Sequence, residues 1–597
     1  MEKPRSRQTN WLQILIVVLL ILGVFFRFAN LDYKVYWHDE VYTSIRAAGY
    51  TRQEIDRELF QNRIIPAKEL QKFQRLKPGS TTTDTISSLA TEDPQHPPLY
   101  FLMARFWMQL FGSSLTASRS LPALLSLLGL PLMYGLGLEL FGSRLVAILA
   151  TTLLALSPFD ILFAQTARQY SLLTVTVIGS NFLLLRALRL QTWQNWVLYS
   201  FCSAVGLYTH PIFGLTLIAQ GAYVLVLSLP FSFLSSWSKS LLPHPSPLLT
   251  KAPVAKGRKL VPPLLRGVRG VLQALSFPKS EILKLNNFWR LSDQFWYYLL
   301  ATIGTLFLYS PWLIVITSNY QRLSATTNWT KVSPGRLHLI KLWILNFTSL
   351  FLDLDFGLES IWSYLLRLPV FILIVVAIYT VCRQTTRTIG LFILTAIFVP
   401  FLILALPDVL FGGKRSTISR YLMSCYPGVQ LVVAYLLANK LLLEQWLWRG
   451  VAVVLITGSI ASCTVSGFSD IWWSKGLSYF NAEVARIINR DEMNAIQANP
   501  PLVLSDIGDD FTNTGDLISL SYLLHDNVQL LLLNNPPNLE ILPSYSKSFV
   551  FRPSKQLCQA LEDKQVSLEQ ASILGRLWRI QPKGSGRSPT NQLLKCS

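Results

Sequence analysis

The sequence has few charged residues for its length. Only 14% of its 597 residues are Asp, Glu, Lys or Arg, whereas 51% are hydrophobic, and the hydrophobic residues come in long runs. Typical soluble domains carry about 25% charged residues. This composition excludes a large soluble enzyme and predicts an α-helical polytopic membrane protein.

Several sequence motifs are absent. The six cysteines form no Cys-x-x-Cys pair and no Cys/His cluster, so neither a structural zinc site nor a disulfide framework is expected. No Walker-type phosphate loop is present, which leaves ATP-driven transport without support. No internal repeat is apparent, and this weakens the case for a secondary transporter built from inverted halves.

The positive charge of the chain does not indicate a nucleic-acid partner. The formal net charge is +20, but the Lys and Arg residues lie in loops between hydrophobic runs. The positive-inside rule and anionic lipid headgroups favour them there. We therefore expect membrane lipid as a partner and no nucleic acid.

The hydrophobic segments predict the topology in the membrane. Basic residues in segment 1–7 place the N-terminus in the cytoplasm, and the basic segment 235–293 falls on the same side. The loop 30–95 is also basic yet should lie outside, and loops longer than about 60 residues follow the rule weakly. We expect about eleven spans, in a multi-pass protein of the plasma or inner membrane. They cover approximately residues 11–28, 120–141, 145–164, 171–188, 195–209, 211–234, 294–317, 361–381, 388–410, 421–438 and 446–466.

The chain divides into two predicted domains. Residues 1–466 form a transmembrane domain, in which residues 30–118 make a first extracytoplasmic loop with interfacial helices such as 97–111. After an odd number of spans, residues 467–597 lie outside. Their short segments "PLVLSD", "NVQLLLLNN", "SFVFRPS" and "GRLWRIQP" predict strands, and 481–497 predicts a helix. We expect a small α/β domain that caps the membrane domain rather than positioning an acceptor.

Polar residues gather where the predicted spans end on the outer side. Ionisable groups at membrane depth are costly, so a residue such as Arg168 is a functional candidate, with an ordinary interfacial anchor as the alternative. Asp39 and Glu40 in "YWHDEVYT" follow the first span directly. The other members are Gln95 and His96, Arg168 and Tyr170, His210, and Lys414, Arg415 and Arg420.

This set pairs carboxylates with cations. A carboxylate can act as a general base on an attacking hydroxyl or amine. Arg and Lys can hold a phosphate and stabilise the negative charge that develops on it as a leaving group. Together they indicate group transfer from a phosphate donor, but a proton or ion pathway with a titrating carboxylate uses the same residues. The residue types alone leave both hypotheses open.

A second acidic motif is "DLD", formed by Asp353 and Asp355. It is similar to the Asp-x-Asp motif with which nucleotide-sugar enzymes chelate a divalent metal. Two aspartates at this spacing often occur by chance, so a solvated pair at a helix end is the favoured interpretation.

Four stretches in order carry a resemblance to a known family. They are "HDEVYT" after the first span, "HPPLYF" opening a helix, "ARQYSLL" after the third span, and "RYLMSCYP" late in the membrane domain. Together, over roughly residues 10–440, they resemble the GT-C glycosyltransferases of family 39. That family includes the protein O-mannosyltransferases and the aminoarabinose transferase acting on lipid A.

The resemblance implies a function and a site. It implies inverting transfer of a sugar from a polyprenyl-phosphate donor to an acceptor at the outer face of the membrane. Asp39 would be the catalytic carboxylate and Glu40 its partner. Because the donor is a lipid monophosphate, neither a metal nor another cofactor is expected. The residues expected to bind substrate are His96, Arg168, Tyr170, His210, Lys414, Arg420 and Tyr421, with Lys414 and Arg420 as ligands of the carrier phosphate.

Two other functions are alternatives. The first is a polytopic lipid or solute transporter that uses the same cavity, and the second is a non-catalytic assembly or scaffold protein that retains the fold. The sequence specifies neither the sugar nor the acceptor, which is a protein, lipid or glycan, because specificity depends on the shape of the pocket.

Overall fold

The computed structural model describes most of the chain. The predicted basic segment 235–293 falls outside the described residues except for its last position, and Asp355 falls outside them too. The described ranges are 6–229, 293–354, 356, 360–443, 445–493, 500–509, 512–534, 537–540, 548–564, 566–572 and 576–581.

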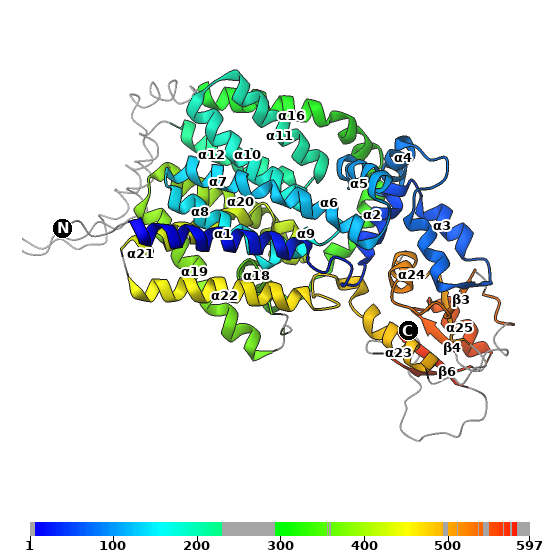
Figure 1. The fold of residues 1–597 in the computed structure, drawn as a ribbon. Helices are drawn as coiled ribbons and strands as arrows, with labels where there is room; N and C mark the ends of the chain where they lie inside the picture. The colour runs from blue at the N-terminus through cyan, green and yellow to red at the C-terminus, as the bar shows by residue number, and fades with distance from the viewer. Residues whose placement is uncertain are drawn as a thin grey trace, which may run out of the picture.

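Long apolar helices form a bundle that makes up most of the molecule (Figure 1). The bundle helices are α1 (Ser6–Phe28), α6 (Leu115–Leu127), α7 (Gly129–Phe141), α8 (Arg144–Ala155), α9 (Pro158–Ala164), α10 (Tyr170–Leu190), α11 (Trp193–Thr209), α12 (Phe213–Ser228), α16 (Asp293–Ser318), α18 (Arg336–Thr348), α19 (Ile361–Gln384), α20 (Arg387–Phe411), α21 (Tyr426–Leu442) and α22 (Trp446–Gly467).

Many of these helices are suited to crossing a membrane. Within the described residues, six helical segments are long and apolar enough to span one, with α6 and α7 counted together. The pair α8 and α9, bent by 55°, passes the same test as one unit. A helix covers each of the eleven predicted segments at least in part. The class of α-helical polytopic membrane protein is therefore confirmed, while the number of spans stays a prediction.

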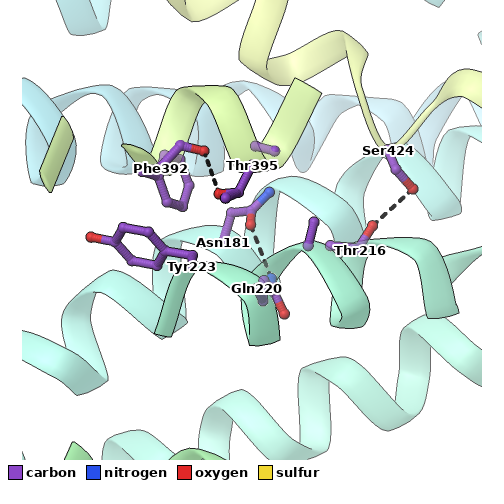
Figure 2. A pocket seen from close by; sticks show the side chains of 9 residues that line it. Asn181, Thr216, Gln220, Tyr223, Phe392, Thr395 and Ser424 are labelled. Carbon is purple, nitrogen blue, oxygen red and sulfur yellow. Dashed lines mark hydrogen bonds between the residues drawn. The ribbon is translucent and has the colours of Figure 1, made fainter. Parts of the chain in front are cut away.

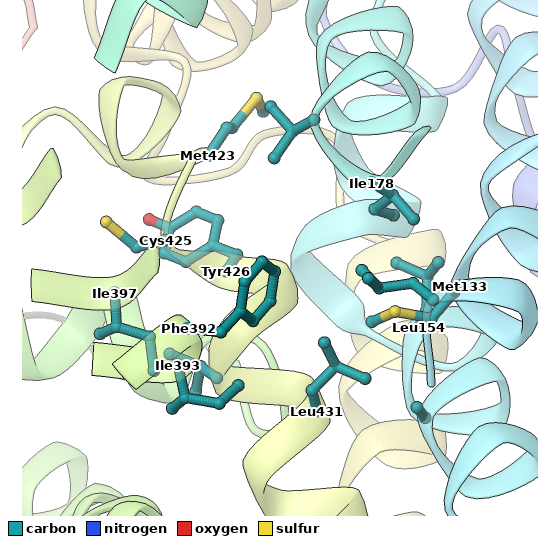
Figure 3. Close-up of a cluster of buried hydrophobic side chains, with 14 of the residues drawn as sticks. Met133, Leu154, Ile178, Phe392, Ile393, Ile397, Met423, Cys425, Tyr426 and Leu431 are labelled. Carbon is teal, nitrogen blue, oxygen red and sulfur yellow. The ribbon is translucent and has the colours of Figure 1, made fainter. Parts of the chain in front are cut away.

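The bundle is held together by a continuous apolar core. Figure 3 shows part of it, where Met133 and Leu154 face Ile178, and Phe392 and Tyr426 pack nearby. All these side chains are buried. Because helix association inside a bilayer depends on close packing rather than on escape from water, this interdigitation is the main cohesive force between the spans.

A second group of elements lies at the end of the bundle opposite the N-terminal end of α1 (Figure 1). The predicted interfacial helix 97–111 is present as α5 (Leu99–Phe111). The other elements outside the long helices are α2 (His38–Ala48), α3 (Arg52–Leu59), η1 (Ala67–Gln74), α4 (Thr82–Glu92), α17 (Tyr320–Thr327), η3 (Asn328–Lys331), η4 (Arg415–Thr417), η5 (Ser419–Leu422) and η6 (Gly476–Ser478).

The C-terminal part contains a sheet with helices, as the sequence predicts. The sheet has the order β1-β3-β2-β4-β6-β5, and β2 is parallel to both β3 and β4. Strands β2, β3, β4 and β6 are the four predicted ones. The bounds are β1 (Arg63–Pro66), β2 (Leu502–Asp506), β3 (Gln529–Leu533), β4 (Ser548–Phe551), β5 (Ser567–Gln570) and β6 (Leu577–Gln581), with α23 (Asn481–Met493), α24 (Asn513–Ser521) and α25 (Lys555–Asp563).

One edge of this sheet comes from the other end of the chain. Strand β1 belongs to the loop after α1 and pairs antiparallel with β3, with Ile64 opposite Leu531. Pro66 ends the strand, and proline is tolerated at such an edge because no further strand needs its N–H. The first loop and the C-terminal segment therefore share one sheet and one apolar core.

The expectation that the chain has no disulfide framework is wrong at one position. Cys558 on α25 is disulfide-bonded, while the other four described cysteines are free. A single disulfide requires no local spacing pattern, so the sequence carries no motif for it.

Two glycines provide a matched test of bundle packing. A Cβ at Gly137 in α7 would lie 2.9 Å from the Ala147 Cα in α8, whereas at Gly450 in α22 it would meet nothing within 4 Å. We expect Gly137→Ala to lower Tm, since overpacking costs about 1–3 kcal/mol. Gly450→Ala should leave Tm unchanged or raise it, because alanine is the better helix former. Thermal unfolding in detergent measures both, and equal Tm values would contradict the close α7–α8 contact.

Candidate active site

Asp39 lies in the first turn of α2, at the bundle end where the chain leaves α1. Its Oδ1 is 3.4 Å from His38 Nδ1, and its Oδ2 is 3.7 Å from an Arg420 guanidinium nitrogen. The side chain is 18% exposed. The N-terminus of a helix favours a negative charge, so this placement stabilises an ionised carboxylate that remains within reach of a ligand.

Arg168 fixes the turn that carries Asp39. Its Nη1 donates to the Asp39 carbonyl oxygen at 3.2 Å and to Thr43 Oγ1 at 3.1 Å. Its Nη2 lies 3.0 Å from His96 Nε2. Because a guanidinium is only a donor, His96 Nε2 must be the acceptor. The ring proton of neutral His96 therefore sits on Nδ1, which is 3.4 Å from Asp93 Oδ1.

Aromatic and imidazole rings join these groups into one cluster. The His96 and His210 ring centroids are 5.8 Å apart, and the His210 and Tyr170 centroids 5.9 Å apart. The Arg420 guanidinium lies 6.0 Å from the Tyr170 ring centroid and 5.2 Å from that of Trp37. Such distances permit cation–π attraction. The structure thus brings the predicted residues Asp39, His96, Arg168, Tyr170, His210 and Arg420 together.

Tyr421 and Lys414 lie on the same loop between α20 and α21 but have different surroundings. The Tyr421 ring centroid is 5.8 Å from the Arg420 guanidinium, and burial raises the pKa of Tyr421 to about 12. Lys414 instead places its Nζ 5.1 Å from the Trp329 ring centroid, and its backbone N–H donates to Thr330. Tyr421 thus belongs beside the cluster, whereas the contacts of Lys414 are with η3.

Glu40 is adjacent to Asp39 in sequence but has a very different environment. It is fully buried, and Arg119 binds it through two nitrogens, at 2.8 Å and 2.9 Å. Lys475 Nζ donates to it at 2.7 Å, and the backbone N–H groups of Ala167 and Trp37 donate at 2.8 Å and 3.0 Å. With five donors around it, this carboxylate is a structural junction.

The junction connects segments that are far apart in the chain. Arg119 also donates to the carbonyl oxygens of Leu31, Lys34 and Val35, which hold the loop between α1 and α2. Ala167 belongs to the turn that carries Arg168. A buried charge is stable only when it is paired and hydrogen-bonded, so these segments are constrained to meet around Glu40.

Both adjacent carboxylates are stabilised in the ionised form. Burial acts to raise the pKa of Glu40, but the charges of Arg119 and Lys475 outweigh it and lower that pKa to about 2. Burial likewise acts to raise the pKa of Asp39. The hydrogen bond with His38 and the charge of Arg420, with a further contribution from Arg168, place the Asp39 pKa well below its usual range.

Arg119, Lys475 and Asp93 contribute to this region without having been predicted from the sequence. Arg119 lies in α6, directly before the predicted span 120–141, and an arginine at such a position is itself a signal of a buried partner. Lys475 and Asp93 carry no such signal. Asp93 lies beside His96 and 3.9 Å from Arg46, and despite burial its pKa is lowered to about 2, mainly through His96.

The favoured interpretation of the "DLD" motif is wrong for its first aspartate. Asp353 is buried rather than solvated, and it accepts from Arg367 at 2.8 Å and from the indole N–H groups of Trp472 and Trp473. The reason is that Arg367 on α19 and the two tryptophans in the segment after α22 supply donors to this loop. Among the described residues, no group of three or more His, Cys, Asp or Glu could hold a metal ion.

A small cavity inside the bundle has polar walls. It lies between α10, α12 and α20, and its space of about 10 Å³ for the centre of a water molecule is near the lower limit for one water. Figure 2 shows Gln220 bonded to Asn181 and Thr216 bonded to Ser424 at its edge. This cavity is too small for a sugar, and none of its lining residues is a predicted site residue.

A glycosyltransferase family matches part of the chain that holds this site. Residues 95–242 match the model of the family described as dolichyl-phosphate-mannose-protein mannosyltransferase. The matched part is less than half of the chain, and it includes His96, Arg168, Tyr170 and His210. The predicted resemblance to the GT-C glycosyltransferases is confirmed by this match, which supports a membrane glycosyltransferase. Comparison with curated protein sequences finds no match.

Solved structures of two kinds are similar to the chain. ArnT from Cupriavidus metallidurans in the apo state has a TM-score of 0.47 at 14% identity, covering 96% of this chain and 98% of that one. The same protein bound to undecaprenyl phosphate has a TM-score of 0.45 at 14% identity, with the same coverage. The Archaeoglobus fulgidus oligosaccharyltransferase tethered to an acceptor peptide has a TM-score of 0.43 at 10% identity, covering 89% of this chain and 65% of that one.

The Glu40 junction predicts a large effect of removing its main partner. Arg119→Met removes two of the five donors to the buried Glu40 carboxylate, and breaking such a buried pair costs about 3–5 kcal/mol. Arg486→Met is the control, because both side chains of the Arg486–Asp470 pair are exposed, at 66% and 41%, and an exposed pair contributes about 1 kcal/mol or less. We expect a marked fall in Tm only for Arg119→Met. Equal Tm values for the two variants would contradict the junction.

Proposed function

We propose that this protein transfers a sugar from a polyprenyl-phosphate-linked donor to an extracytoplasmic acceptor with inversion at the anomeric carbon. The observation that carries the proposal is the pairing of an accessible, ionised carboxylate with cations. Asp39 Oδ2 lies 3.7 Å from an Arg420 guanidinium nitrogen, and Arg168 donates a hydrogen bond to the Asp39 carbonyl oxygen. The family match supports it, since dolichyl-phosphate mannose is a polyprenyl-type phosphate sugar.

The transfer assigns separate roles to these groups. Asp39 removes the proton from the acceptor hydroxyl or amine as the acceptor atom attacks the anomeric carbon. The new bond forms while the bond between that carbon and the phosphate oxygen breaks, so the proton ends on the carboxylate. Arg420 and Arg168 stabilise the charge that accumulates on the departing phosphate. Attack from the side opposite the leaving group inverts the anomeric centre.

Donor binding also prepares the base in this scheme. A carboxylate whose pKa is far below neutrality is a weak base. The cations that lower the Asp39 pKa are the groups that would bind the donor phosphate, and its negative charge offsets theirs. The pKa of Asp39 therefore rises when the donor is bound. The carboxylate becomes a better base only when there is a sugar to transfer.

The remaining predicted residues form the walls of the donor site in this proposal. His96, Tyr170 and His210 present rings on the side of Arg168, where rings can pack against a sugar. Tyr421 lies beyond Arg420. Lys414, on the outer part of the loop next to Trp329, would attract the carrier phosphate on its way to Arg420.

We assign the bundle end that holds Asp39 to the extracytoplasmic side. It lies opposite the N-terminal end of α1 (Figure 1), and the charges of that N-terminal segment favour the cytoplasm. The disulfide at Cys558 agrees with this side, because disulfides persist in oxidising compartments. In this assignment the transmembrane catalytic domain, 1–466, and the domain 467–597 meet at the outer surface.

Substitution of the two central residues tests the proposal. Purified protein in lipid is given a set of polyprenyl-phosphate sugars, and sugar transfer or hydrolysis is measured. We expect Asp39→Asn to reduce turnover by at least about 100-fold, in the range for loss of a general base, and Arg420→Ala to do likewise through loss of leaving-group stabilisation. Arg486→Ala is the control, because the pair of Arg486 with Asp470 is exposed. Full turnover by Asp39→Asn would contradict the assignment.

The pH dependence provides an independent test of donor-induced activation. The profile of kcat/KM reports the free enzyme and that of kcat the donor complex. The lowered pKa of free Asp39 predicts that kcat/KM has no acid limb from this group above about pH 4, near the ordinary aspartate pKa. The kcat profile should lose activity at a higher pH, because bound phosphate raises the pKa. A kcat acid limb at or below that of kcat/KM would refute the donor effect.

A further inference from the structure

His38 separates Asp39 from the C-terminal domain. Its Nδ1 is 3.4 Å from Asp39 Oδ1, and its ring centroid is 4.8 Å from that of Tyr42. Its Nε2 is buried, and among the described residues it has no hydrogen-bond partner. A carboxylate only accepts hydrogen bonds, so the proton of a neutral His38 must sit on Nδ1 for this contact to form. His38 thus holds one carboxylate oxygen of Asp39.

The backbone of His38 is bound by the segment that follows α22. The His38 N–H donates to Ser478 Oγ at 3.0 Å, and the Ser478 hydroxyl donates in turn to Asp516 Oδ1 at 3.0 Å. Asp516 is fully buried in α24 and is also bonded to Arg552 at 2.9 Å. A continuous chain of hydrogen bonds therefore runs from the first turn of α2 into the interior of the C-terminal domain.

The side chain of His38 meets the same domain at a position where only glycine fits. A Cβ at Gly515 in α24 would lie 2.8 Å from His38 Cδ2, 3.1 Å from His38 Nε2 and 2.5 Å from Tyr42 Cε2. The backbone of α24 is thus in direct contact with the imidazole edge that points away from Asp39. The ring cannot rotate toward α24, and its other edge remains directed at the carboxylate.

We propose that His38 is a positioning residue for Asp39 and that the C-terminal domain is part of the catalytic site because it fixes His38. This inference rests on the proposed function and specifies how its general base is held. With Oδ1 held by His38, Oδ2 is directed to Arg420, where the donor phosphate and the acceptor meet. The C-terminal domain is therefore more than a cap over the membrane domain.

The geometry has a consequence for the basicity of Asp39. The charged or titratable groups around this carboxylate are His38 on α2, Arg168 before α10, Arg420 and Tyr421 on η5, and Lys475 after α22. If only the His38 hydrogen bond is lost, the ionised form of Asp39 loses one stabilising interaction while the other groups stay in place. The pKa of Asp39 then rises, and the acid limb of the kcat profile moves to higher pH. A general loss of stability does not predict this shift.

Two substitutions at position 38 separate positioning from packing. His38→Asn keeps a donor at the place of Nδ1, because the amide nitrogen is also attached to Cγ. His38→Leu keeps similar bulk but has no donor. Because misplacement of a catalytic group by about 1 Å can cost about 100-fold in rate, we expect His38→Leu to lower kcat by about 10-fold or more with KM for the donor unchanged. His38→Asn should retain kcat within about 3-fold.

The contact with the C-terminal domain has its own matched pair. Gly515→Ala pushes against the His38 ring, whereas Gly476→Ala, in the same part of the chain, meets nothing within 4 Å. We expect Gly515→Ala to lower kcat and to move the acid limb to higher pH, as His38→Leu does, while Gly476→Ala behaves as wild type. The measurements are kcat, KM and pH profiles for the full chain in lipid with the donor that wild type consumes.

The outcomes distinguish this inference from the proposed function. If wild type consumes no polyprenyl-phosphate sugar, the proposed function fails, and this inference fails with it. If Asp39→Asn abolishes turnover but His38→Leu retains wild-type kcat and pH profile, only the role of His38 is overturned. Equal losses in His38→Asn and His38→Leu without a shift in the pH profile would also overturn it. If Gly515→Ala does not fold, the pair at position 38 decides.

Discussion

The buried carboxylate of Glu40 is the constraint on which the arrangement of this molecule depends. A fully buried charge requires donors on every side, and here they come from the loop after α1, from α6, from the turn before α10 and from the segment after α22. All four segments therefore meet at Glu40. Because Asp39 is the neighbouring residue, the junction at Glu40 also fixes the first turn of α2, which carries Asp39.

Of the two adjacent carboxylates, Glu40 therefore has a structural role, and Asp39 has the proposed catalytic role. Successive residues in a helix point about 100° apart, so one side chain enters the protein interior while the next faces the cluster of Arg168 and Arg420. Among the described residues, five groups donate to the Glu40 carboxylate, whereas the Asp39 carboxylate has the long contacts at 3.4 Å to His38 and 3.7 Å to Arg420. In the proposed function, an acceptor and a phosphate would replace these two contacts.

Much of this arrangement could be predicted from the sequence, because it follows from local patterns. The apolar segments predict the helices, and the motifs at their outer ends predict that Asp39, His96, Arg168 and Arg420 converge. The strands of the C-terminal domain are visible as short apolar runs between turn residues.

The partners of buried charges could not be predicted, because they lie far away in the chain. Lys475 is 435 residues from Glu40, and nothing in its neighbourhood marks it. Strand β1 is only four residues long and ends in proline, so its sequence does not predict a strand. Asp353 looked like a solvated acid because two of its donors, Trp472 and Trp473, lie 119 and 120 residues away in the segment after α22.

A structure with a bound donor analogue tests the central claim most directly. The analogue is a polyprenyl sugar phosphonate that cannot be cleaved, added to the wild-type protein in lipid. The account predicts that the phosphonate contacts the Arg420 guanidinium and that the anomeric carbon faces Asp39 from the side opposite the phosphonate. A phosphonate bound away from Arg420, or an anomeric carbon turned from Asp39, would contradict it.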